Sequence, residues 1–256
     1  MKKRFVIKLG GRVQSEPHLA RQLADAWKLC DGGLCIVHGG GDEVTALQRQ
    51  MGQEPSFIGG RRVTAATDIA LLRMALSGSA NKNLVASLTA AGVAAVGISG
   101  EDGGLIEAEL IDESRLGKAG KPVRVRVRLL ETLLDAGYMP VISPVSSDVR
   151  STTGAALNVN GDDAAASIAA ELKAELWLIS DVPGVMDDRE SVLSAVDPAQ
   201  TEDLVARGIV SRGMQAKLEA GFAALTAGAT GVRIAASSAI TDLTQGTTLF
   251  PAPSLR

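Results

Sequence analysis

The sequence predicts an α/β protein built around a central, mainly parallel β-sheet. Short apolar runs alternate with longer segments of helical periodicity along most of the 256 residues. This alternation is typical of repeated βαβ units, because each crossover helix returns the chain to begin a parallel strand. The first apolar run, Phe5-Val6-Ile7-Lys8-Leu9, is typical of a central strand buried on both faces. A doubly wound sheet is therefore expected.

The first half of the chain supplies regular βα units and then a change of pattern. Residues 103–128 end in Val123-Arg124-Val125-Arg126-Val127-Arg128, whose period of two predicts a β-hairpin with a half-exposed strand. We interpret its arginines as a solvated strand face rather than an anion site. The other predicted elements are strands at 4–9, 33–38 and 93–98 and helices at 17–29, 42–51 and 67–91, the last of which Ser77-Gly78-Ser79 could divide in two.

A loop rich in Ser, Asp and Thr, ending at Thr153, follows a predicted helix at 129–135 and strand at 138–142. We interpret it as the boundary between an N-terminal lobe, residues 1–150, and a C-terminal lobe, residues 151–256, that share one continuous sheet. The βα rhythm then resumes. It predicts helices at 162–172 and 212–227 and strands at 175–179 and 232–235.

The composition argues against several classes of protein. With 46% hydrophobic residues and 26 basic against 29 acidic residues, the chain resembles neither a disordered protein nor a basic nucleic-acid binder. Its partner is expected to be a small molecule. No apolar stretch reaches the roughly 18 residues that span a bilayer, and the first apolar run is too short for a signal peptide, so a cytoplasmic location is expected. Cys30 and Cys35 fit reduced core thiols better than a disulfide or a metal site.

Three glycine-rich turns directly follow apolar strands. They are Lys8-Leu9-Gly10-Gly11, His38-Gly39-Gly40-Gly41 and Ser180-Asp181-Val182-Pro183-Gly184. Such turns place backbone N–H groups at helix N-termini, where the helix dipole favours phosphate. One turn alone would be weak evidence because glycine also serves tight connections, but several at one sheet edge predict an anion site. A dinucleotide fingerprint (GxGxxG) after the first strand and a GxxxxGK[ST] phosphate loop are both absent.

Two lysines flank the predicted anion site. Lys8 lies inside the first strand, where a buried ammonium needs an anion nearby unless it extends to solvent. Lys217 lies near the start of its helix, at the end of the dipole that disfavours a cation. A bound anion would explain both positions, and an ordinary strand-end or surface lysine is the alternative for each.

Polar residues before two elements are further candidates. The segment Asn158-Val159-Asn160-Gly161-Asp162-Asp163 precedes a helix, and capping accounts for only one or two of its four polar side chains. The remainder could contact a ligand or orient the lysines. Arg61-Arg62-Val63-Thr64 follows two glycines, and the paired arginines could be solvated or could bind a carboxylate bidentately.

In order along the chain, these segments resemble the N-acetylglutamate kinases of the amino acid kinase family. The resemblance runs from Phe5 to about Ala235 and depends on motifs met in sequence order. The family pattern of KLGG, HGGG, RVT, NKxLV, SGxDG, NxNxD, SDVxGV and GMxxK is matched by Lys8 to Gly11, His38 to Gly41, Arg62 to Thr64, Asn81 to Val85, Ser99 to Gly103, Asn158 to Asp162, Ser180 to Val185 and Gly213 to Lys217.

The resemblance implies an open, three-layer αβα sandwich that binds an acyl amino acid in its N-terminal half and ATP in its C-terminal half. It implies phosphorylation of the γ-carboxylate of N-acetyl-L-glutamate, a step of arginine biosynthesis, with Mg²⁺ arriving with the nucleotide. The implied catalytic residues are Lys8 and Lys217, which neutralise the transferring phosphoryl group, and Asp162, which orients both. The implied binding residues are Gly40, Gly41, Arg62 and Asn158 for the substrate, and Gly10, Gly11, Asp181, Val182, Pro183, Gly184, Val185, Met186, Ile209, Val210 and Ser211 for ATP.

The chemistry agrees with these roles. A γ-carboxylate is already ionised at neutral pH, so it needs no general base and the enzyme must bring two anions together in line. Lysines and glycine N–H groups suit that electrostatic task. His38 is therefore expected to be structural.

The chain departs from the family pattern in three places. Arg61 adds a positive charge before the RVT motif, arginine alternation replaces a glycine-rich hairpin at 121–128, and Arg212 replaces one of two glycines. These changes leave open a sibling kinase of N-succinylglutamate or of carrier-linked aminoadipate or glutamate. A non-catalytic sensor would not need Lys8, Asp162 and Lys217 together. Because arginine-inhibited family members carry an additional N-terminal helix, we expect a homodimer without arginine feedback.

Overall fold

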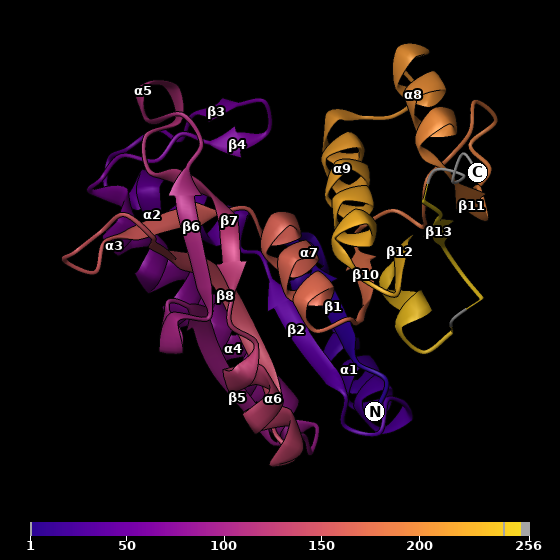
Figure 1. Cartoon of the computed structure of the whole chain (residues 1–256), viewed down its shortest axis with the longest axis horizontal. Coiled ribbons are helices and arrows are strands. Elements are labelled where there is room, and N and C mark those ends of the chain that lie inside the picture. Colours follow the sequence, from indigo (N-terminus) through magenta and orange to yellow (C-terminus); the bar gives the residue numbers. More distant parts are fainter. Residues whose placement is uncertain (1, 243, 252–256) are drawn as a thin grey trace.

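One sheet of eleven strands runs through both halves of the protein, as the computed structural model of residues 2–242 and 244–251 shows (Figure 1). The side chain of Arg212 lies outside that description. The strand order is β11-β13-β12-β10-β1-β2-β8-β6-β7-β9, and β5 also pairs with β8. The strands are β1 (Phe5–Leu9), β2 (Leu34–His38), β5 (Ala95–Gly100), β6 (Ile106–Leu110), β7 (Ala119–Val125), β8 (Met139–Asp148), β9 (Ala156–Val159), β10 (Glu175–Ile179), β11 (Ala195–Val196), β12 (Gly231–Ala235) and β13 (Thr247–Leu249).

The centre of the sheet is parallel, as predicted. Strand β1 pairs in parallel with β10 on one side and β2 on the other, and β10 continues in parallel to β12. The carboxyl ends of these strands therefore share one edge. That edge carries all three glycine-rich turns, which follow β1, β2 and β10.

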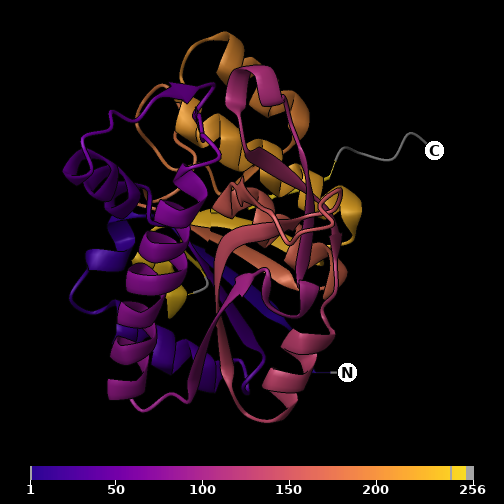
Figure 2. The ribbon, with the colours of Figure 1, turned by 90° about the vertical axis from the view of Figure 1, so that its left-hand side faces the viewer.

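Helices cover both faces of the sheet, and Figure 2 shows them on either side of the twisted strands. Along β1, Val6 joins the hydrophobic cluster on the face of α7 and α9, whereas Ile7 joins the cluster on the face of α1 and α4. This period of two explains why the strand is apolar throughout. The helices are α1 (Leu19–Leu29), α2 (Gly41–Gln50), α3 (Asp68–Leu72), α4 (Asn81–Ala90), α5 (Glu113–Leu116), α6 (Arg128–Asp135), α7 (Gly161–Glu171), α8 (Pro198–Ala206) and α9 (Arg212–Ala227), with shorter or irregular turns η1 (Arg12–Ser15), η2 (Arg73–Ala80), η3 (Asp102–Gly104) and η4 (Ser237–Ile240).

A small hairpin, β3 (Phe57–Ile58) and β4 (Arg61–Arg62), stands apart from the main sheet. Its two-residue turn consists of Gly59 and Gly60, both with positive φ, at 57° and 78°. A turn with positive φ at both central residues matches the twist of a hairpin, and glycine adopts it without strain. The hairpin was not predicted from the sequence.

The structure corrects two predicted boundaries. The helical stretch at 67–91 does not break at Ser77-Gly78-Ser79, because residues 73–80 form a π-helix that joins α3 to α4. The predicted loop from residue 143 to Thr153 is strand as far as Asp148, because the second half of β8 pairs with β6 and β9. Those partners are distant in sequence, so the polar residues alone indicated a loop.

One element outside the prediction, helix α8, had local features that could have revealed it. Helix α8 begins with a capping box formed by Asp197 and Gln200, followed by Pro198 at the first helical position. Both features mark a helix N-terminus. The short strands β9, β11 and β13 have no comparable local pattern. Within the described residues, no helix has the length and apolarity needed to cross a membrane.

Candidate active site

Lys8 is buried beside the first turn of α7. It occupies the same face of β1 as Val6, which is the face that α7 covers. Its Nζ lies 2.9 Å from Oδ1 of Asp162, and both residues are less than a tenth exposed. The contact is an ion pair whose geometry does not align a hydrogen bond. A buried ammonium is thereby compensated, as the burial of Lys8 requires.

Helix α7 begins where it can hold Asp162 in this position. The N-cap Asn160 accepts a hydrogen bond from the Asp162 N–H at 2.8 Å, and Asp162 and Asp163 lie in the first turn. Acidic residues there are favoured by the helix dipole. The predicted capping function of the Asn158 to Asp163 segment therefore accounts for Asn160 and leaves Asn158 and Asp162 available.

Lys217 lies on the other side of the same charge cluster. Burial lowers its pKa from the ordinary value, Asp162 raises it, Lys8 lowers it and Asp181 raises it. These mutual influences place both lysines and both carboxylates in one electrostatic neighbourhood. Lys8 and Lys217 come from β1 and α9, so the parallel sheet and its covering helix bring together residues far apart in sequence.

Three cavities of about 230, 260 and 240 Å³ form a continuous series along the carboxyl edge of the sheet. The first shares Lys8, Gly11 and Gly41 with the middle one. The middle one shares Asp181 and Lys217 with the third. We call these the acyl-side, central and nucleotide-side cavities, after the ligands that the sequence analysis predicts for their lining residues. The two lysines stand at the junctions, one at each.

Helix N-termini border this series of cavities. Gly41 begins α2, Gly161 begins α7, and both line the acyl-side cavity. Ser211 and Gly213 at the start of α9 line the nucleotide-side cavity. The first N–H groups of a helix lack intrahelical partners and attract anions. Three helix starts with two lysines therefore make the edge suited to phosphate and carboxylate. The prediction that each glycine-rich turn leads into a helix is correct only for His38 to Gly41, because Gly10-Gly11 leads into the short turn η1 and Ser180 to Gly184 leads into a loop before β11.

Gly40 shows why that turn must be glycine. Its φ is 151°, and an added Cβ would lie only 2.6 Å from Cδ2 of Leu76 in η2. A side chain at position 40 would be strained by this φ and would also displace the Leu76 side chain of the π-helix. Leu76 and Leu72 form an apolar wall of the acyl-side cavity, and the sequence analysis did not identify either residue.

Arg62 also lines the acyl-side cavity and is anchored to α2. Its Nη2 donates to the Gly41 carbonyl at 2.8 Å and to Thr45 Oγ1 at 2.9 Å, and its Nη1 donates to Gln48 Oε1. Burial lowers the pKa of the Arg62 guanidinium, which Asp68 and Asp42 raise. Arginine keeps its charge even so. Three neutral acceptors fix the guanidinium without neutralising it, so its charge remains available to an anionic ligand.

Asn158 lies across the same cavity on β9. Its Nδ2 donates to Thr64 Oγ1 at 2.9 Å, which joins the NxNxD segment to the RVT segment 94 residues earlier. The structure thus brings together all four predicted substrate residues, because Gly40, Gly41, Arg62 and Asn158 line one cavity. Two further lining residues, Phe57 and Ala119, had no distinguishing feature in the sequence.

The nucleotide-side cavity contains most, but not all, of the residues predicted for it. Asp181, Val182, Gly184, Met186, Ile209, Val210 and Ser211 line it, and Gly10 and Gly11 line the neighbouring central cavity. Pro183 is exposed and lies outside the lining. Val185 is fully buried, and its N–H donates to Thr247 Oγ1, so it supports the turn from beneath. Met214 and Gly213 are additional lining residues.

His38 is structural in its contacts. Its Nδ1 donates to the Gly39 carbonyl at 2.7 Å, and its Nε2 accepts from Asn81 Nδ2 at 3.1 Å. Burial lowers the pKa of His38 to about 4. The ring is therefore neutral at physiological pH. Asn81, fully buried, also donates to the Val141 carbonyl at 2.9 Å, so the NKxLV motif ties β2 to β8.

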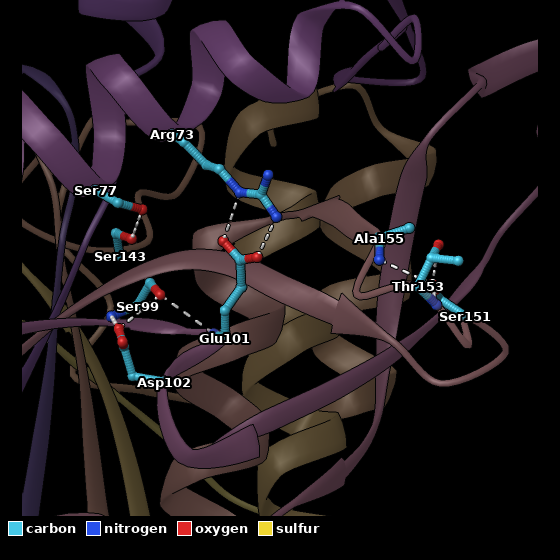
Figure 3. Close-up of polar contacts among 9 residues, drawn as sticks. All are labelled: Arg73, Ser77, Ser99, Glu101, Asp102, Ser143, Ser151, Thr153 and Ala155. Atoms are coloured by element: carbon cyan, nitrogen blue, oxygen red, sulfur yellow. Dashed lines mark hydrogen bonds and ion pairs between the residues drawn. The ribbon is translucent and has the colours of Figure 1, made fainter.

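The SGxDG motif is likewise explained by local structure. Asp102 accepts hydrogen bonds from the Ser99 N–H and from Ser99 Oγ at 2.8 Å, which closes the turn after β5. Figure 3 shows Glu101 facing Arg73 of η2, with Ser77 and Ser143 in contact nearby. These bonds fasten the π-helix to the sheet. The motif supports the wall that carries Leu72 and Leu76.

The arginine alternation and the cysteines also have structural explanations. Arg124 and Arg126 pair with Glu107 across the β6–β7 hairpin, as a solvated strand face would. Cys30 and Cys35 are both free and buried, and burial raises their pKa values to about 11 and about 12. Neither thiol is reactive at neutral pH.

Comparison with known proteins gives a consistent result along nearly the whole chain. Residues 3–236 match the amino acid kinase family. An acetylglutamate kinase of Methanopyrus kandleri is 43% identical over 87% of this chain and 91% of its own length. One of Geobacillus kaustophilus is 41% identical over 88% of this chain and 87% of its own. The solved structure of smu.665 from Streptococcus mutans UA159 has a TM-score of 0.84 at 27% identity, covering 97% of this chain and 99% of that one.

Proposed function

This chain belongs to the amino acid kinase family, and we propose that it transfers the γ-phosphoryl group of ATP to the γ-carboxylate of N-acetyl-L-glutamate. The product would be N-acetyl-L-glutamyl 5-phosphate, and the reaction would be the second step of arginine biosynthesis. The observation that carries this proposal is the placement of Lys8 and Lys217 at the two junctions of the cavity series, with Asp162 paired to Lys8. The related curated kinases are named for acetylglutamate, which gives no support to the N-succinyl and carrier-linked alternatives.

The mechanism we infer is positioning and charge neutralisation. The attacking oxygen belongs to an ionised carboxylate, so no proton has to be removed. Lys8 would meet the transferring phosphoryl group from the acyl side, and Lys217 would meet it from the nucleotide side. Each fixed charge stabilises negative charge that accumulates in the transition state, an effect worth about 10²- to 10³-fold for one donor. Asp162 would hold Lys8 in place and keep the net charge of the empty site low.

The acyl-side cavity suits a dicarboxylate that carries an apolar acyl group. Arg62 and the Asn158 amide would bind the α-carboxylate end, and the N–H groups of Gly40 and Gly41 would bind the γ-carboxylate near Lys8. Leu72 and Leu76 provide an apolar wall for the rest of the ligand. Each carboxylate of the substrate would therefore meet a donor.

ATP would occupy the nucleotide-side cavity. Met186, Ile209, Val210 and Met214 offer apolar contacts to a base, and the start of α9 offers N–H groups to phosphates. Mg²⁺ would be held mainly by phosphates and water. The acidic residues near the centre fit that arrangement, since Asp162 pairs with Lys8 and Asp181 pairs with Arg12. Among the described residues, no group of three or more His, Cys, Asp or Glu side chains is placed to hold a metal ion by itself.

The proposal also covers which ligand each lobe binds, the oligomeric state and the cellular location. We infer that residues 1–150 bind the acyl amino acid and residues 151–256 bind ATP, with β9 and the start of α7 reaching across to the acyl side. We also infer a cytoplasmic homodimer without arginine feedback. Size-exclusion chromatography with light scattering should give twice the 26.4 kDa chain mass. A hexamer, or inhibition by arginine, would contradict this part.

An ADP-release assay tests the activity directly. N-acetylglutamate, N-succinylglutamate, glutamate and aspartate are each supplied with MgATP, and hydroxylamine traps any acyl phosphate as a hydroxamate. We expect turnover and hydroxamate with N-acetylglutamate, and much less with the free amino acids. If no acylated substrate gives hydroxamate, the proposed function is wrong.

A further inference from the structure

The β3–β4 hairpin forms one wall of the acyl-side cavity, to which it contributes Phe57, Gly60, Arg61 and Arg62. It is a two-stranded piece outside the main sheet, visible at the upper left of Figure 1. Its first strand is exposed, with Phe57 54% accessible to solvent. So small a piece is not stable by itself and needs contacts with the rest of the protein to keep its position.

Consecutive arginines of β4 tie this hairpin to two different helices. Successive side chains of a strand point to opposite sides. Arg62 bonds to Gly41, Thr45 and Gln48 of α2. Arg61 instead pairs with Asp163 of α7, with 2.7 Å between Nη1 and Oδ2, although the two residues are 102 positions apart. The hairpin therefore bridges the two helices whose N-termini border the acyl-side cavity.

We infer that Arg61 is a positioning residue for the acyl amino acid, acting through Asp163. The pair fixes the hairpin wall to the helix that carries Asp162, so that Arg62 faces a cavity of constant width. Among the described side-chain contacts, this ion pair is what joins β4 to α7. The inference rests on the proposed function for the identity of the ligand, but the fixing of the hairpin can be measured without turnover.

The pair has the geometry expected of a positioning contact. Side-chain exposure is 34% for Arg61 and 23% for Asp163, so the charges are partly shielded from water and salt. Asp163 also lies in the first turn of α7, where the dipole stabilises its carboxylate. Both effects favour a pair that persists in solution over an incidental surface contact.

Replacement of Asp163 by Asn distinguishes positioning from direct binding by the sign of the effect. Asp163→Asn removes a negative charge beside a site for anions, so electrostatics alone would tighten binding and lower KM. Asp163→Asn would also lower KM if Arg61, released from Asp163, bound the substrate carboxylate directly. A loosened hairpin has the opposite effect. We expect KM for N-acetylglutamate to rise about three- to fivefold, the size of one partly shielded pair, with KM for ATP unchanged.

Double-mutant and exchange measurements complete the test. Arg61→Gln should raise the same KM by a similar factor, and Arg61→Gln/Asp163→Asn should be no worse than either single variant. Amide hydrogen exchange across residues 56–63 should accelerate about three- to fivefold in both single variants. Glu175→Gln is the matched control, because it removes a carboxylate of similar exposure, 20%, from the Lys3 pair at the amino end of β10, away from the hairpin and from all three cavities. It should change neither exchange in 56–63 nor KM.

The outcomes separate this inference from the proposed function. An unchanged or lowered KM in Asp163→Asn, or unchanged exchange in the hairpin, overturns the positioning role while turnover by the unmodified protein still supports the kinase. Absence of turnover with accelerated exchange in both variants leaves the hairpin fixed by the pair and removes the kinase assignment.

Discussion

The acyl-side and nucleotide-side cavities are held in different ways. Arg62, Asn158 and Thr64 are linked by side-chain hydrogen bonds that join α2, β4 and β9, and two of these three residues are less than a tenth exposed. Asp181 and Ser211 on the nucleotide side are exposed, and the lining there is mainly loop and helix start. If the proposed ligands are right, we expect fixed polar groups to select the acyl substrate, and apolar contacts and backbone groups to select the nucleotide.

Lys8 lies between the two regions, and its replacement should have the largest effect. Lys8→Met removes a charge needed most in the transition state, so kcat should fall about 10²- to 10³-fold while the Kd for ATP changes little. Steady-state kinetics and nucleotide titration measure the two quantities. Lys28→Met, at an exposed position on α1, is the control. Equal losses in kcat and nucleotide affinity would contradict the role.

Arg62→Lys should weaken substrate binding in the acyl-side cavity and leave ATP binding in the nucleotide-side cavity unchanged. Lysine cannot reproduce the fork that reaches Gly41, Thr45 and Gln48, and one charged hydrogen bond is worth about 1.5–3 kcal/mol. KM for N-acetylglutamate should therefore rise about 10- to 100-fold with KM for ATP within about twofold. If both KM values rise together, the two cavities are not independently held.

The neutral ring of His38, which joins β2 to α4 through Asn81, should make the stability of the fold depend on pH. Because its pKa is lowered to about 4, the folded protein resists protonation that the unfolded chain accepts near the ordinary value of 6.5. Stability is therefore full above pH 6.5 and declines as pH falls towards 4. Between pH 7.5 and 5 this histidine should contribute a loss of about 2 kcal/mol in the free energy of unfolding.

Denaturant titration at both pH values measures that loss. It should be present in the unmodified protein and absent in His38→Gln, which cannot titrate. His18→Gln, at the exposed N-cap of α1, is the matched control and should retain the pH dependence. The same pH dependence in His38→Gln as in the unmodified protein would show that other groups cause it.

Val210→Ala should give the smallest effect and sharpen the contrast from the nucleotide side. Val210 is half-buried in the lining, and loss of its methyl contacts should cost about 1 kcal/mol, or about fivefold in KM for ATP. KM for N-acetylglutamate should not change. A larger effect on the acyl substrate would mean that the nucleotide-side wall also shapes the acyl-side cavity.

Local pattern accounted for most of the regular elements. The strand at 175–179 and the helix at 212–227 were predicted with the bounds that the structure has. Their apolar period and their capping or turn residues lie within the segment itself, so no distant partner was needed. The second half of β8 was missed because its strand character comes from pairing with β6 and β9.

The sequence by itself determined the βα order and the glycine turns, because periodicity and turn chemistry are local properties, and from them it predicted an anion site at one edge of a parallel sheet. It could not decide between readings of single side chains such as Lys8 or Arg61. Only the tertiary structure paired Lys8 with Asp162 and Arg61 with Asp163, and placed His38 against Asn81. Each of these contacts joins elements that are far apart in the chain, so local sequence patterns could not predict it. The protonation state of a side chain such as Lys8 or His38 depends on its burial and its partners, which only the folded structure supplies.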